Sequence, residues 1–203
     1  MSRLRLMILM VAAGALLTTG CLSKPYPNKN YFSLSAELPN TTTVQKAKRY
    51  TLMVGTVNAA SGFEDRLLVY RIGPNQYETD FYNEFVAAPA RLLADLAAQH
   101  LDNINSKVRV VKNPGMRMAD FGLETYLEGI FGDFTVTPPA ATVNIRFTLN
   151  DLRGSQAKVI MDKTYRCTRS IQEKKPTALV AGMNVCVNEI LNELNQDFEK
   201  MAR

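Results

Sequence analysis

The residues with the most distinctive chemistry are three cysteines, Cys21, Cys167 and Cys186, and a single histidine, His100. Metal sites need several such ligands at short spacings, and these four residues are scattered along the chain. A Ser-His-Asp hydrolase would have to use His100, but the chain contains no Gly-x-Ser-x-Gly turn. His100 lies near the end of a predicted helix, where a polar or cationic ring is favoured. We therefore predict no metal site, no catalytic residue and a structural role for His100.

Cys21 follows a segment typical of export. Arg3 and Arg5 precede an apolar run over residues 6–17, which is shorter than the roughly 20 apolar residues of a membrane span. Small residues then lead to Gly20 and Cys21, a pattern that resembles the bacterial lipobox, with Thr18 where leucine is usual. We predict a signal peptide over residues 1–20 and lipidation of Cys21.

The residues after Cys21 predict a tether. Residues 22–30 contain two prolines and no periodicity, and nine extended residues reach about 30 Å. Residues 31–203 are then expected to form one domain, facing the periplasm. Leu22 stands where an aspartate would suggest retention in the inner membrane, so we expect the outer membrane.

In an oxidising compartment, Cys167 and Cys186 are candidates for a disulfide. Cys167 shares the apolar face of a predicted strand, and Cys186 lies at the edge of the apolar stripe of the last helix. If that helix packs on that strand, the two thiols can meet. The alternative is a pair of free cysteines that pack as small apolar residues.

The composition argues against several function classes. The net charge of +5 includes Arg3 and Arg5, so it falls to +3 without the signal peptide. Basic and aromatic residues do not interleave, so nucleic acid is not an expected partner. The chain has no Walker-type phosphate loop, and no cofactor is expected. The 19 acidic residues leave open a carboxylate pair of the glycosidase type, so a periplasmic hydrolase remains an alternative.

Periodicity predicts the domain's architecture. Apolar residues alternate with polar ones over residues 143–151, which is typical of a strand with one wet face. Apolar residues recur at helical spacing after Pro89 and again over residues 177–201, and shorter β-rich segments lie between. We predict an α+β fold, in which two main amphipathic helices pack on one face of a largely antiparallel sheet.

Residues 67–101 carry a family resemblance. A strand, Leu-Leu-Val-Tyr-Arg, is followed by Tyr77, by Phe-Tyr-Asn-Glu-Phe ending at Phe85, and by a helix that opens at Pro89. This block resembles the ABC-type transport auxiliary lipoproteins, which accompany MCE-type lipid transport systems. The family often has tryptophan before the proline; this chain has none, and Phe85 takes that place.

The resemblance implies an accessory subunit that is not an enzyme. Its partners would be a periplasmic MCE protein and, through it, an inner-membrane ABC permease and ATPase, for transport of phospholipid or another hydrophobic molecule. Tyr77, Tyr82 and Phe85 are candidate partner contacts, because they precede the first long helix in a segment expected to be a loop, although the rings could instead fill the core. A subunit of another outer-membrane secretion or export assembly is the alternative, and the oligomeric state is open, with a homo-oligomer among the options.

Overall fold

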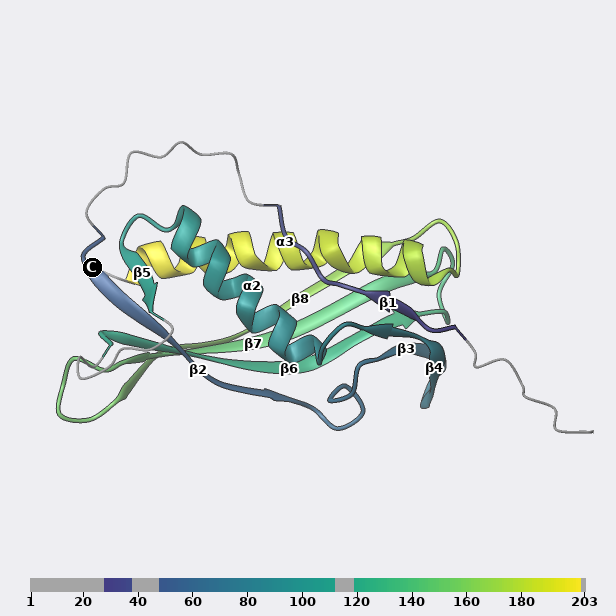
Figure 1. The fold of residues 1–203 in the computed structure, drawn as a ribbon, viewed down its shortest axis with the longest axis horizontal. Coiled ribbons are helices and arrows are strands. Elements are labelled where there is room, and N and C mark those ends of the chain that lie inside the picture. Colours follow the sequence, from purple (N-terminus) through teal and green to yellow (C-terminus); the bar gives the residue numbers. More distant parts are fainter. Residues whose placement is uncertain (1–27, 38–47, 112–118, 202–203) are drawn as a thin grey trace, which may run out of the picture.

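The structure is a computed structural model that describes residues 28–37, 48–111 and 119–201. The elements follow in the order β1 (Asn30–Phe32), β2 (Tyr50–Ala59), β3 (Leu67–Gly73), β4 (Gln76–Phe85), α2 (Pro89–Ile104), β5 (Val108–Val111), β6 (Phe121–Asp133), β7 (Ala140–Asp151), β8 (Lys158–Ser170) and α3 (Pro176–Met201) (Figure 1). The predicted α+β class is confirmed.

Strand β6 lies at the centre of the sheet. Along one edge it pairs antiparallel with β7, which pairs antiparallel with β8, and these two pairings are the longest in the sheet. Along its other edge, β6 pairs in parallel first with β2 and then, at Gly132 and Asp133, with β3. Strand β5 lies outside β2, whereas β4 and then β1 lie outside β3. The sheet is therefore mixed, with its parallel pairs on the side of β2 and β3.

Both helices cover the same face of this sheet (Figure 1). Helix α3 packs on β7 and β8, and α2 packs on β2, β5 and β6. The alternation in β7 points four side chains into this layer, and each is at most 1% exposed: Val143, Ile145, Phe147 and Leu149. Each such side chain stabilises the fold by about 1.5–3 kcal/mol relative to an exposed one.

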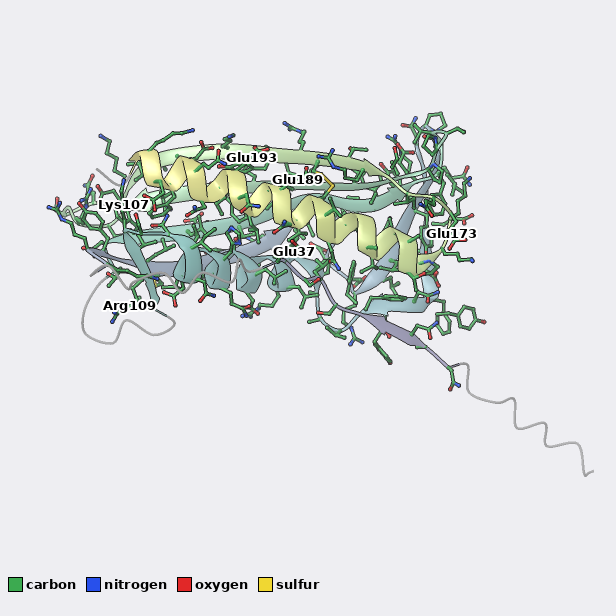
Figure 2. The ribbon with its side chains drawn as sticks, turned by 90° about the horizontal axis from the view of Figure 1, so that it is seen from above. Glu37, Lys107, Arg109, Glu173, Glu189 and Glu193 are labelled. Atoms are coloured by element: carbon green, nitrogen blue, oxygen red, sulfur yellow. A yellow bond between two sulfur atoms is a disulfide. The ribbon has the colours of Figure 1, made fainter. Side chains whose placement is uncertain are left out.

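Helix α3 approaches the sheet closely at Gly182. A Cβ atom there would lie 2.8 Å from Ile171 Cγ2 and 2.9 Å from Ala141 Cβ, so a larger residue would push the helix away. Two acidic residues of α3, Glu189 and Glu193, lie on its side next to β8 (Figure 2), where Glu189 pairs with Arg169. Among the described residues, no helix is long and apolar enough to cross a membrane.

Candidate functional site

The three aromatic residues proposed from the sequence as partner contacts all lie on strand β4. The expectation of a loop before the first long helix is wrong, because β4 continues to Phe85. Phe85 is 1% exposed and packs in the core, so its ring is not available to a partner. Tyr77 and Tyr82 are 48% and 53% exposed, and they are the two candidates that a partner can reach.

Strand β4 contains an outward bulge. Leu67 pairs with Glu84, but the next residue, Leu68, pairs with Asp80. Residues 81–83 therefore have no counterpart on β3, and they project as an extra segment that we call the aromatic bulge. It presents Phe81 and Tyr82 with their ring centroids 5.3 Å apart, edge to face.

Asp80 holds the bulge in place. Its carboxylate accepts hydrogen bonds from the backbone N–H groups of Tyr82 at 2.9 Å and Asn83 at 3.1 Å. The Asn83 side-chain amide donates at 2.9 Å, and the Tyr70 hydroxyl donates at 2.7 Å. Burial alone raises the pKa of Asp80, but these hydrogen bonds outweigh burial and hold the pKa below its ordinary value. The carboxylate is therefore ionised, and it organises the turn as an anchored acceptor.

A second carboxylate, Glu84, holds the bulge against β1. Glu84 is 4% exposed and forms ion pairs with Lys29 at 3.3 Å and Arg66 at 3.4 Å. The Lys29 ammonium also lies 4.6 Å from the centroid of the Phe81 ring. Strand β1 pairs in parallel with β4 from the last residue of the bulge onward, with Asn30 opposite Asn83. The bulge is thus fixed on both sides by strand pairing and charge.

A groove runs beside this edge of the sheet. It has a volume of about 700 Å³, and its walls come from β1, from Asn83 of the bulge and from the start of α3, with these lining residues: Lys29, Asn30, Tyr31, Phe32, Asn83, Lys175, Pro176 and Thr177. Tyr31 is 58% exposed, as is Phe81. Apolar rings and lysines therefore lie together at one end of the domain.

Tyr77 belongs to a separate aromatic cluster. Its ring packs edge to face against Phe131, at 5.7 Å between centroids, and against Phe63 at 6.3 Å. Arg71 lies over the Phe131 ring and forms an ion pair with Asp133, the last residue of β6. One side of the Tyr77 ring therefore packs on Phe131 and Phe63, and the rest is exposed to solvent. This is expected of a side chain that contacts another protein.

Cys167 on β8 and Cys186 on α3 are joined by a disulfide in the structure (Figure 2). Their Cα atoms are 5.3 Å apart, within the range of natural disulfides. The bond ties the last helix to the outer strand of the sheet. Cys21, the predicted lipidation site, lies outside the described residues.

His100 is fully buried in helix α2. Burial lowers the pKa of the imidazole, and the neighbouring Asn192 side chain offsets only part of that shift. A substrate could not reach this ring without opening the core. Within the described ranges, no three His, Cys, Asp or Glu side chains are grouped to hold a metal ion.

The chain also resembles known proteins in sequence and fold. Residues 32–195 match the family of ABC-type transport auxiliary lipoprotein components. The chain belongs to this family. The match confirms the resemblance seen in residues 67–101 and extends it over most of the domain. No curated protein matches the chain.

Three solved structures share the fold of this chain. Protein XCC0632 from Xanthomonas campestris is 17% identical and superposes with a TM-score of 0.67, covering 81% of this chain and 92% of its own. An uncharacterized protein is 16% identical with a TM-score of 0.63, covering 85% and 97%. The hypothetical protein CT253 from Chlamydia trachomatis is 11% identical with a TM-score of 0.50, covering 76% and 98%. At these identities the likeness establishes the fold alone.

Sequence patterns did not predict the residues that build the aromatic bulge, above all Asp80, Phe81 and Lys29. One signal was present: Phe81 and Tyr82 are adjacent, and neighbouring side chains of a strand point to opposite faces. On a sheet with one covered face, two adjacent large rings cannot both be buried in a regular strand. The role of Asp80 depends on contacts with Tyr70 of another strand, and no local pattern shows it.

Proposed function

We propose that this protein is a lipid-anchored, non-enzymatic subunit of an MCE-type ABC transport system that moves phospholipid or another hydrophobic molecule. Residues 1–20 are removed, Cys21 carries the lipid, and the domain faces the periplasm from the outer membrane. The family match over residues 32–195 is the observation that carries this proposal. The burial of His100 supports a binding role over hydrolysis, because the ring is closed off from any substrate.

In this proposal, the domain acts by binding the periplasmic MCE protein, which links it to the permease and ATPase. Tyr77 is the side chain we assign to this contact, since it stands out from a packed aromatic cluster and loses little freedom on binding. Its neighbour Arg71 is fixed by Asp133 and offers a positioned cation beside it.

Affinity purification of the full-length lipoprotein from detergent-solubilised envelopes tests this proposal. The MCE protein should co-purify, and Tyr77→Ala should weaken its binding about 30-fold if the ring contributes the roughly 2 kcal/mol of an interface anchor. Tyr126→Ala is the matched control, because Tyr126 is 40% exposed and lies on another strand, β6.

Recovery of secretion or export proteins in place of an MCE protein would instead favour a different outer-membrane assembly. Hydrolytic activity that depends on His100, with no transport component recovered, would overturn the proposal in favour of an enzyme. Lipidation is tested separately: Cys21→Ser should abolish labelling by an alkyne fatty acid, and unchanged labelling would refute that part.

A further inference from the structure

The aromatic bulge and strand β1 form the largest gathering of exposed rings in the described part of the chain. Tyr31, Phe81 and Tyr82 are each more than half exposed, and Val86 beside them is 48% exposed. Exposed rings that merely fill surface area are usually scattered, whereas these lie on adjacent segments of two paired strands.

These rings are held in position and are not loosely attached. Asp80 fixes the bulge through four hydrogen bonds, and Glu84 fixes Lys29 beside it. A surface that is exposed, apolar and ordered in advance loses little conformational entropy when it meets a partner.

The length of the tether limits what that partner can be. Seven residue steps separate Cys21 from Asn28, the first described residue, and Lys29 follows directly. Seven extended residues span at most about 25 Å. If Cys21 carries the lipid, as the proposed function requires, this end of the domain stays close to the bilayer surface, with the rings of β1 and the bulge nearest to it.

The chemistry of this surface suits the headgroup layer of a membrane. Tyrosine combines an apolar ring with a polar hydroxyl, and such rings are enriched where hydrocarbon meets water. Lys29 lies against the Phe81 ring, and Lys175 lines the adjoining groove, so their ammonium groups are near the same edge. The Lys175 side chain is 65% exposed and can keep its ammonium among the headgroups while the rings enter the interface, whereas Lys29 neutralises the buried Glu84 beside them.

We propose that the aromatic bulge and β1 rest on the lipid bilayer and fix the orientation of the domain relative to its anchor. Tyr82 then contacts lipid, whereas Tyr77, near the start of β4, stays available to the protein partner. The inference rests on the lipid anchor of the proposed function, but it requires no MCE protein.

A single tryptophan can test this contact, because the chain contains none. The chain from Cys21 onward is coupled through the Cys21 thiol to maleimide phospholipid in vesicles of phosphatidylethanolamine with a minority of phosphatidylglycerol. Chemical coupling supplies the anchor whether or not cells acylate Cys21, so failure of this inference is distinguishable from failure of lipidation. Tyr82→Trp is the reporter, and Tyr126→Trp, at an exposed tyrosine of β6, is the matched control.

Brominated lipids should quench the fluorescence of Tyr82→Trp by a several-fold larger fraction than that of Tyr126→Trp. In vesicles without bromine, the emission of Tyr82→Trp should be shifted to shorter wavelength relative to that of Tyr126→Trp. Adding Tyr31→Ser and Phe81→Ser to the Tyr82→Trp chain should sharply reduce the quenching. Equal quenching of the two reporters would overturn the inference. A Tyr82→Trp emission that shifts only when the MCE protein is added would also overturn the inference, because the bulge would then contact protein and not lipid.

Discussion

Replacement of Asp80 by alanine should remove the support of the aromatic bulge. The carboxylate accepts hydrogen bonds from Tyr70, from the backbone of Tyr82 and from both the backbone and side chain of Asn83. Alanine leaves all four donors without this acceptor. The bonds from Tyr70 and Asn83 are part-buried, so water replaces the carboxylate less readily there than at the exposed bond from Tyr82.

The expected cost follows from these contacts. A hydrogen bond to a charged group is worth about 1.5–3 kcal/mol, and bonds that share one acceptor do not add. We therefore expect Asp80→Ala to lower the free energy of unfolding by about 2–4 kcal/mol. Asp80→Asn keeps one acceptor oxygen but loses the charge, so its cost should be about half as large.

Asp162→Ala provides a matched control. Asp162 also accepts hydrogen bonds from an arginine, Arg146, but both side chains are exposed on the sheet. Exposed ion pairs contribute about 0–1 kcal/mol, so this variant should unfold almost like the wild type.

Urea unfolding measures the free energies, and hydrogen exchange reports on the bulge itself. The amides of Tyr82 and Asn83 should exchange much faster in Asp80→Ala and unchanged in Asp162→Ala. Since the pKa of Asp80 is lowered in the folded state, its contribution is complete above the unfolded value of about 3.9 and is lost as the pH falls through the folded pKa. Equal unfolding energies for the two alanine variants at neutral pH would refute the assigned role of Asp80.

Three further predictions concern the core. Phe85→Ala should lower the free energy of unfolding by about 3–5 kcal/mol in urea titrations, because the Phe85 ring is buried. Tyr82→Ala should lower it by less than about 1 kcal/mol, and similar values for the two variants would contradict the burial of one ring and the exposure of the other. Peptide mass spectrometry without reductant should recover Cys167 linked to Cys186, and Cys186→Ala should cost about 3 kcal/mol because the bond closes a loop of 19 residues; two free thiols in the unfolded protein would rule it out. Burial lowers the pKa of His100, so stability should fall by up to about 1.4 kcal/mol per pH unit as the pH drops from about 6.5 towards the folded pKa. His100→Leu should flatten that dependence just below a pH of about 6.5, and an unchanged slope would assign it to other groups.

The sequence by itself determined the strands and helices that bury one face, because such an element shows its buried face as a regular local pattern of apolar residues. The alternation through Val143 and Leu149 predicted β7, and the helical spacing of Met183 and Phe198 predicted α3. Each pattern repeats the geometry of its own backbone, so it is visible without knowing the partner strand or helix. The same reasoning placed Cys167 and Cys186 on the faces where the structure joins them.

Only the tertiary structure decided which strands are neighbours and which rings are exposed. The parallel pairing of β3 with β6 joins Arg71 to Asp133, and these residues are far apart in the chain. Phe85 and Tyr82 are three residues apart and both aromatic, yet one is buried and the other is exposed. Their difference comes from a register shift between β3 and β4, because the pairing partner, and not the local sequence, sets which residues of a strand face the core.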